Sequence, residues 1–197
     1  MPSGSHILDV KKFGNPVLRK VAEPISEIND EIRELVEEMV DTMYEENGIG
    51  LAAPQVGRSL RVFVIDTHFE DETYGSEGEK LLCPKMPLAL INPEIISTSG
   101  EDISFEEGCL SIPQINAAVV RPSNIVLKAQ TLDGDIIEAD FGGLTSRCMQ
   151  HEIDHLDGVL FTDKAEKDDL KLVAKKLEQL RMKTEKALKK RKAKKRR

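Results

Sequence analysis

The stretch that decides the fold of this chain is Thr145-Ser-Arg-Cys-Met-Gln-His-Glu-Ile-Asp-His-Leu156. It is predicted to form a helix, with Thr145 or Ser146 as the N-cap. Residues four apart lie on one face of a helix, so the imidazoles of His151 and His155 can bind the same metal ion.

Glu152 lies between the two histidines and is too short to replace either as a ligand. It is well placed to take a proton from a water molecule at the metal. Gly158 follows the expected end of the helix, where a residue with positive φ is common. The pattern His-Glu-x-x-His also fits two solvated histidines on an exposed helix face, so a metal site needs further ligands.

Cys109 is the strongest candidate for a third ligand. A thiolate binds borderline-soft dications well, and the preceding Gly108 allows close backbone approach. The alternative is a small buried hydrophobic residue, the commonest role of an unpaired cysteine. Cys83 and Cys148 fit that alternative better, and Cys148 is expected to line the pocket because it shares the helix face of His151.

Other candidate ligands are less well supported. His6 is near the N-terminus and His68 adjoins an expected loop, while Glu166 and Glu178 lie downstream with nothing to mark them. A catalytic site with three protein ligands leaves one position for water, whereas a structural site normally has four. The set of Cys109 and two histidines therefore favours catalysis.

The fold class is predicted to be α+β, with mainly antiparallel sheets packed around a central helix that carries the His-Glu-x-x-His pattern. Apolar residues at helical spacing from Ile32 to Met43 predict an N-terminal helix. Ser26, Asn29 or Asp30 can cap its start, and Asn47-Gly48 ends it. A C-terminal helix is expected to start near 163–167 and to fray past Met182.

Strand-like sequence fills the region between the expected helices. Asn92-Pro93 interrupts one of these strands, and short gaps separate the strands that follow it. The segment 67–87 is polar and rich in Gly and Pro, so it is expected to be an exposed loop. Asp133-Gly134 predicts a hairpin turn. The predicted strands are 61–66, 88–96, 103–112, 117–120, 125–132 and 135–139.

The chain has 197 residues, enough for one sizeable core. Residues 1–182 are predicted to form a single catalytic domain and 183–197 a basic tail. Residues 171–197 carry 14 Lys or Arg and two acids, a charge of +12, so the net charge of -7 leaves -19 for the other 170 residues. The basic end suggests an anionic partner, and the alternative is a simple solvated terminus.

The three cysteines and the absence of a secretory pattern predict a cytoplasmic protein with reduced thiols. No apolar stretch approaches the roughly 18 residues needed to span a bilayer, so no membrane association is expected.

Three segments together resemble the signature motifs of peptide deformylases. They are Gly48-Ile-Gly-Leu-Ala-Ala-Pro-Gln-Val-Gly57, Glu107-Gly-Cys-Leu-Ser111 and Gln150-His-Glu-Ile-Asp-His155, in the order and spacing of the family. Phe13-Gly-Asn-Pro-Val-Leu-Arg19 resembles the N-terminal segment of the family. The likeness runs from about residue 7 to about residue 182.

The resemblance implies an enzyme that removes the formyl group from the formyl-methionine of nascent bacterial polypeptides. It implies one divalent metal ion, usually Fe²⁺ although Zn²⁺, Ni²⁺ or Co²⁺ can occupy the site, bound by Cys109, His151 and His155. It also implies that Glu152 is the catalytic acid and base and that the side-chain amide of Gln55 helps hold the carbonyl oxygen.

Further site residues follow from this interpretation. The backbone N–H of Leu110 is a second donor to the oxyanion, and the segment of Ile49 and Gly50 can pair with a peptide strand. Gly108 can bind the same peptide, and Cys148 contributes to the pocket for the methionine side chain. Because the substrate emerges from the ribosome, the basic tail is expected to contact ribosomal RNA.

Two other functions are compatible with parts of the sequence. A metallopeptidase that cleaves internal peptide bonds would need a downstream His or Glu ligand, and none stands out. A binding protein that uses the basic tail on RNA would have a structural metal. The segment Gln114–Pro122 has no basic residue before Arg121, although some deformylases place an arginine there near the peptide.

Overall fold

The computed structural model describes residues 6–67 and 74–195. Within these ranges one sheet follows the order β1-β2-β3-β4-β5, with every neighbouring pair antiparallel. The predicted α+β class and antiparallel pairing are confirmed. The strands are β1 Gly50–Ala52, β2 Val62–Ile65, β3 Leu88–Cys109, β4 Ile112–Gln130 and β5 Ile136–Phe141. The α-helices are α1 Asp30–Glu45, α2 Glu77–Leu82, α3 Gly143–Leu156, α4 Phe161–Lys164 and α5 Lys167–Lys195.

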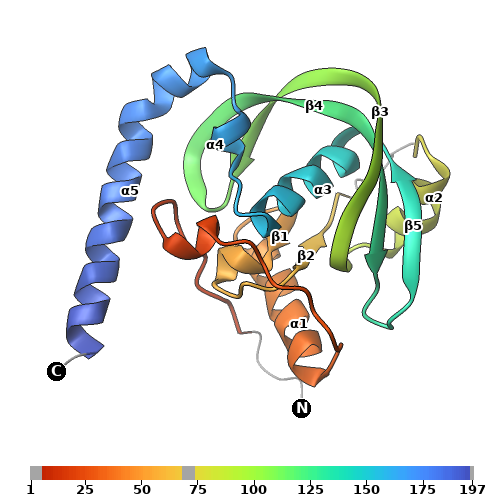
Figure 1. Cartoon of the computed structure of the whole chain (residues 1–197), viewed down its shortest axis with the longest axis horizontal. Helices are drawn as coiled ribbons and strands as arrows, with labels where there is room; N and C mark the ends of the chain where they lie inside the picture. The colour runs from red at the N-terminus through yellow and green to blue at the C-terminus, as the bar shows by residue number, and fades with distance from the viewer. Residues whose placement is uncertain (1–5, 68–73, 196–197) are drawn as a thin grey trace.

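The β3–β4 hairpin is longer than predicted and arches over α3 (Figure 1). The predicted interruptions of these strands are wrong. The chain stays extended, and the irregular positions are register shifts in the pairing of β3 with β4. One shift lies between Ile91 and Glu94, where Asn92 has a φ of 49°. The Asn92 side chain accepts from the N–H of Ile25 and donates to its carbonyl, both at 2.8 Å. The predicted turn at Asp133-Gly134 does connect β4 to β5.

Helix α1 forms where the apolar spacing predicts it. Asn29 provides the N-cap, and its side chain accepts from the N–H of Ile32 at 3.1 Å. Such a cap stabilises a helix by about 1 kcal/mol. The buried face of α1, which includes Met39 and Met43, packs in one core cluster with β1 and β2. This packing supports the strand that borders the functional site.

Helix α3 contacts β1, β2 and β4 and is largely buried. It begins at Gly143 with Gly142 as its N-cap, so the prediction of Thr145 or Ser146 as the cap is wrong. Thr145 instead shares a hydrogen bond of 2.8 Å with Thr67, and Ser146 accepts from the side chain of Gln150. Gly158 follows the helix with a φ of 73°, as predicted.

The sequence predicted an exposed loop at 67–87. This prediction is wrong for the second half of the segment, which contains α2. Residues 68–73 lie outside the described residues. Ser76 caps α2, and helix packing against β5 overrides the polar composition. The carboxylate of Glu79 accepts from the N–H groups of Gly75, Ser76 and Gly142, the last at 3.0 Å. This segment therefore supplies the cap that α3 lacks in its own sequence.

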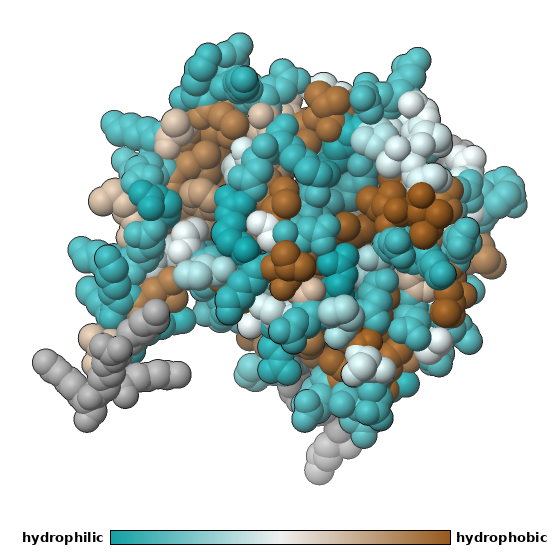
Figure 2. Space-filling view, viewed as in Figure 1, coloured by the Kyte–Doolittle hydropathy of each residue, from teal (hydrophilic) through white to brown (hydrophobic). Residues whose placement is uncertain are grey.

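Helix α5 starts at Lys167 after the short α4, and it does not fray at Met182 but continues to Lys195. Its apolar residues Leu170, Val173, Leu177 and Leu180 pack against a buried cluster that includes Leu18 and Phe161. Figure 1 shows α5 along the outside of the molecule, and Figure 2 shows mainly hydrophilic side chains on its outer side. Nowhere in the described ranges is there a helix both long enough and apolar enough to cross a membrane.

Candidate metal centre and catalytic pocket

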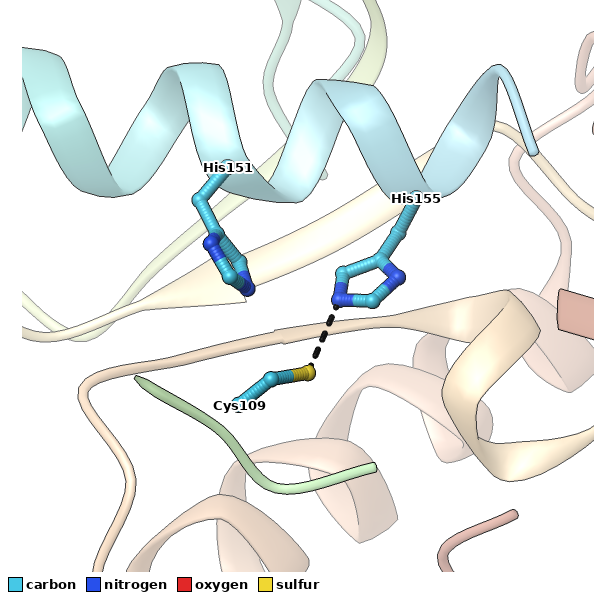
Figure 3. A group of neighbouring side chains, drawn as sticks. All are labelled: Cys109, His151 and His155. Carbon is cyan, nitrogen blue, oxygen red and sulfur yellow. Dashed lines mark hydrogen bonds between the residues drawn. The ribbon is translucent and has the colours of Figure 1, made fainter. Parts of the chain in front are cut away.

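The two histidines of α3 and Cys109 converge on one point. Both imidazoles project from the same side of α3 toward Cys109, which ends β3 (Figure 3). The Nε2 of His155 lies 3.2 Å from the Cys109 Sγ, and ligand atoms of all three residues lie within 4.8 Å of one another. Helical spacing accounts for the histidine pair, and the β3–β4 hairpin brings Cys109 to it.

The donor chemistry of this group fits a divalent transition metal. Burial would raise the pKa of the Cys109 thiol, but the adjacent His155 and His151 outweigh it and hold that pKa well below its usual value. A thiolate and two imidazoles form a soft set of three ligands, the number that catalytic sites use when they leave a position for water or substrate. In the described part of the chain it is the one group of His, Cys, Asp and Glu residues with this proximity.

Three of the other candidate ligands make contacts elsewhere in the structure. His6 pairs with Glu38 at 3.2 Å and is exposed, and His68 is not among the described residues. Glu166 accepts from the Ser104 hydroxyl at 2.9 Å. Glu178 binds Arg181 on the surface of α5. None of these contacts involves Cys109.

Glu107 fixes the orientation of the His151 imidazole through a hydrogen bond. Its Oε2 accepts from the His151 Nδ1 at 3.0 Å, which leaves Nε2 to face Cys109. Burial would raise the pKa of Glu107, but Arg121 and His151 hold it well below its usual range. The sequence prediction assigned Glu107 no role, although a carboxylate two residues before a candidate ligand is the signal that could have identified it.

Glu107 belongs to a buried network of charges. Arg121 donates to both of its carboxylate oxygens, at 2.6 and 2.9 Å, and also to Asp154 at 2.8 Å. Arg147 adds a bond of 2.7 Å to Glu107, and Lys164 binds Asp154 at 2.6 Å. Arg121 is the one basic residue of Gln114–Pro122, and its side chain is 2% exposed, does not line the cavity and joins β3, β4 and α3.

Glu152 is buried beside the ligand group. Burial raises its pKa to about 7, and its Oε2 has no hydrogen-bond partner among the described residues. A Cβ atom at Gly50 would lie 2.5 Å from the Glu152 Oε1 and 2.7 Å from the Cys148 Sγ. Glycine at position 50 therefore leaves the space in which the Glu152 carboxylate lies.

Gln55 has its side-chain amide fixed in one orientation. Its Oε1 accepts from the N–H of Ala52 at 2.8 Å, so its Nε2 points the other way. That nitrogen lies 3.5 Å from the Cys109 Sγ and 3.3 Å from the Ser111 Oγ. The short helix η2, Ala53–Val56, holds Gln55 in this position, where it can donate to a group near Cys109.

A cavity of about 490 Å³ joins these groups. The predicted residues that line it are Ile49, Gly50, Gln55, Gly108, Cys109, Leu110, Cys148, His151 and Glu152. Burial raises the pKa of the Cys148 thiol, which keeps it neutral, and its Sγ lies 3.5 Å from the carbonyl of Ile49. Phe105, Leu144 and Arg147 also line the cavity and carry no signal in the sequence that distinguishes them from ordinary core or surface residues.

Comparisons with known proteins agree with this geometry. Residues 7–171 match the model of the polypeptide deformylase family. The peptide deformylase of Acidobacterium capsulatum is 48% identical over 155 residues, which cover 79% of this chain and 84% of that protein. That of Dictyoglomus thermophilum is 44% identical, covering 84% of this chain and 97% of the other.

A solved structure shows the same fold. The peptide deformylase of Synechococcus elongatus in complex with actinonin has a TM-score of 0.75 and 41% identity, covering 86% of this chain and 87% of the other. The chain belongs to the peptide deformylase family.

Proposed function

We propose that this enzyme removes the formyl group from the formyl-methionine of nascent polypeptides, releasing formate and a free N-terminal amine. One observation carries the proposal beyond family membership. The buried Glu152, with its Oε2 unpartnered among the described residues, lines one cavity together with Cys109 and His151, and the ligand atoms of these two residues lie within 4.8 Å of that of His155. The cavity, which is large enough for a small ligand, therefore brings together a group for proton transfer, a candidate metal site and an amide donor.

We propose that Cys109, His151 and His155 bind one divalent ion, with Fe²⁺ the physiological metal and Zn²⁺, Ni²⁺ or Co²⁺ as possible replacements. Their nitrogen and sulfur donors suit all four ions. When bound, such an ion supplies Lewis acidity toward the formyl carbonyl and toward the attacking water. Its positive charge would also lower the pKa of the adjacent Glu152.

Glu152 acts as the base and then as the acid. As a carboxylate it takes a proton from the water that attacks the formyl carbon, and it returns this proton to the amine that leaves. Burial raises the pKa of Glu152 to about 7 without a metal, and a bound ion would lower it, which favours the carboxylate form that takes the first proton.

Gln55 and the backbone N–H of Leu110 stabilise the oxygen that becomes negative during the attack. The Gln55 amide needs no reorientation, because Ala52 already holds its Oε1. One donor of this kind contributes roughly 3–4 kcal/mol in comparable oxyanion holes.

The peptide backbone is held between two extended segments. Ile49 and Gly50 lie on one side, where the N–H of Asp66 donates to the Ile49 carbonyl at 2.9 Å and keeps the segment extended. Gly108 lies on the other side. The methionine side chain occupies the cavity beside Ile49, Leu110 and Cys148.

We propose that the enzyme works in the bacterial cytoplasm, near the ribosome from which its substrate emerges. We further propose that residues 183–197 contact ribosomal RNA, because this segment holds ten Lys or Arg and one acid, Glu185. The described part of it is a helix, and exposed basic side chains on it include Lys186, Lys190 and Arg191, a form that can follow a phosphate backbone.

The decisive experiment combines metal analysis of anaerobically purified protein with two parallel assays. Formate release from formyl-Met-Ala-Ser should accompany stoichiometric iron, and casein should remain uncleaved. Cleavage of casein without formate release would instead support an endopeptidase.

A further inference from the structure

The short turn between β3 and β4 carries one of the two protein donors proposed for the oxyanion. Because β3 ends at Cys109 and β4 begins at Ile112, Leu110 and Ser111 form the whole connection. Two-residue hairpin connections favour turns in which at least one of the two residues has a positive φ. Neither Leu110 nor Ser111 has a positive φ, so this turn lacks the local preference and depends on contacts from other segments.

The N-terminal segment supplies such contacts. The Lys12 Nζ donates to the Leu110 carbonyl at 3.0 Å, and the backbone N–H of Phe13 donates to the Ser111 carbonyl at 2.9 Å. The Phe13 side chain packs against the buried cluster that includes Ile112, which fixes this segment beside the start of β4. Two consecutive residues therefore bind both carbonyl groups of the turn.

The Lys12 ammonium also lies near the end of α1. It is 3.6 Å from the Oε2 of Glu46, the C-cap residue of that helix, and the Lys12 side chain is 33% exposed. Glu46 and Leu110 line the catalytic cavity, whereas Lys12 does not. Lys12 therefore holds Leu110 from outside the cavity, without contact to the space for the substrate.

We propose that Lys12 is a positioning residue for the oxyanion, which acts by holding the Leu110 carbonyl so that the Leu110 N–H stays aimed into the cavity. A hydrogen bond from an ammonium is roughly twice as strong as one between neutral groups, so it suits a turn without local support. A donor that is aimed in advance needs no reorganisation when negative charge develops. The same turn contacts the second donor, because the Ser111 Oγ accepts from the Gln55 Nε2 at 3.3 Å. The inference rests on the proposed deformylase function and adds one residue to it.

The test replaces Lys12 with methionine, which keeps an apolar stem and removes the ammonium. With formyl-Met-Ala-Ser and the metal-loaded enzyme, we expect kcat to fall about tenfold, a part of the roughly 10²- to 10³-fold that loss of a whole oxyanion donor costs. KM should stay within about twofold, because the lost positioning acts in the transition state. Lys12→Arg keeps a charged donor for the Leu110 carbonyl and should restore most of the lost kcat.

A second measurement is independent of turnover. In the Zn²⁺-loaded protein, amide hydrogen exchange followed by NMR should become faster at Leu110 and Ser111 in Lys12→Met. The amide of Met39, in the buried face of α1, should exchange as in the unchanged protein. Equal acceleration at all three amides would show a general loss of stability and would overturn the proposal.

Lys11→Met is the matched control. The Lys11 ammonium binds Asp9 at 3.1 Å and not the turn, and the change keeps the Lys11 backbone N–H, which donates to the Gln55 carbonyl at 2.7 Å. This enzyme should therefore keep its kcat.

An unchanged kcat in Lys12→Met would overturn the role of Lys12 while leaving the deformylase assignment intact. An equal loss in Lys11→Met would also overturn it, as would a change in KM alone or a loss that Lys12→Arg does not restore. Absence of formate release by the unchanged, metal-loaded enzyme would overturn the deformylase assignment, and this inference with it.

Discussion

Glu152 is the residue whose environment most directly indicates its chemistry. It is buried, yet its Oε2 has no partner in the described structure, and the candidate metal ligands Cys109 and His151 line the same cavity. Glu152→Gln keeps the shape of the side chain and removes its ability to carry the proton. We expect deformylation to fall by about 10²- to 10⁴-fold while the bound metal, measured by plasma mass spectrometry, stays constant.

Glu106→Gln is the matched control for that change, because Glu106 lines the same cavity but is exposed. Its activity should stay close to that of the unchanged enzyme. If Glu152→Gln retained full activity with full metal content, the role of Glu152 as acid and base would be refuted.

Cys109 provides a second prediction for single residues. A serine hydroxyl is a weaker ligand than a thiolate for a borderline-soft ion, so Cys109→Ser should reduce iron stoichiometry and activity together. Metal titration of the chelator-treated protein measures the change in affinity directly. Cys83→Ser, in the turn Cys83–Lys85 outside the cavity, should bind metal normally. Unaltered iron affinity in Cys109→Ser would exclude Cys109 as a ligand.

Between elements, the charge network around Arg121 connects β3, β4 and α3. Arg121→Met removes a buried cation. It leaves Glu107 with Arg147 and His151, and Asp154 with Lys164. Removing one partner of a buried ion pair typically lowers the free energy of unfolding by about 3–5 kcal/mol. Because both carboxylates keep other partners, we expect a loss of about 3 kcal/mol, near the lower end of this range. Urea unfolding of the metal-free protein checks this value without a contribution from metal binding.

Arg61→Met is the control for the network, since Arg61 pairs with Asp157 at 2.7 Å near the protein surface. A partly exposed pair of this kind contributes about 0–1 kcal/mol. Equal losses of unfolding free energy in the two variants would show that the Arg121 network does not act as a buried unit.

The elements also show where local sequence rules fail. The start of α3 contains Thr145 and Ser146, good capping residues, but the helix begins two residues earlier. The N–H of Gly142 is bound by Glu79, which is 63 residues away in the chain. No local pattern predicts this contact, because it depends on how α2 packs against β5.

For the whole molecule, the acidic body and the basic end of α5 predict separate roles. Deleting residues 183–197 removes the contact between Arg191 and Asp9, an exposed pair of 3.3 Å with little expected effect on stability. Turnover of short formyl peptides should therefore be unchanged. Binding to ribosomes should weaken, and its dependence on salt should become shallower because fewer phosphates are neutralised.

Ribosome co-sedimentation at two salt concentrations measures this effect. Replacing Lys186, Lys189 and Lys190 with glutamine offers a variant that keeps the length of the helix. Identical ribosome binding by the full and the shortened chain would remove the proposed role of the basic segment.

The sequence by itself determined the features that depend on short spacing. The four-residue interval places His151 and His155 on one side of α3, the apolar spacing predicts α1, and Asp133-Gly134 makes the turn into β5. These follow from the geometry of a single helix turn or hairpin, so neighbouring residues suffice.

Only the tertiary structure decided the surroundings of those residues. It brings Glu107 behind His151, 44 residues apart in the chain, and it joins Arg121 to Asp154 across 33 residues. It also keeps β3 and β4 extended through the expected breaks, so that Cys109 at the end of β3 reaches the histidines of α3. The physical reason is that burial and pairing between distant segments outweigh local preferences of the chain.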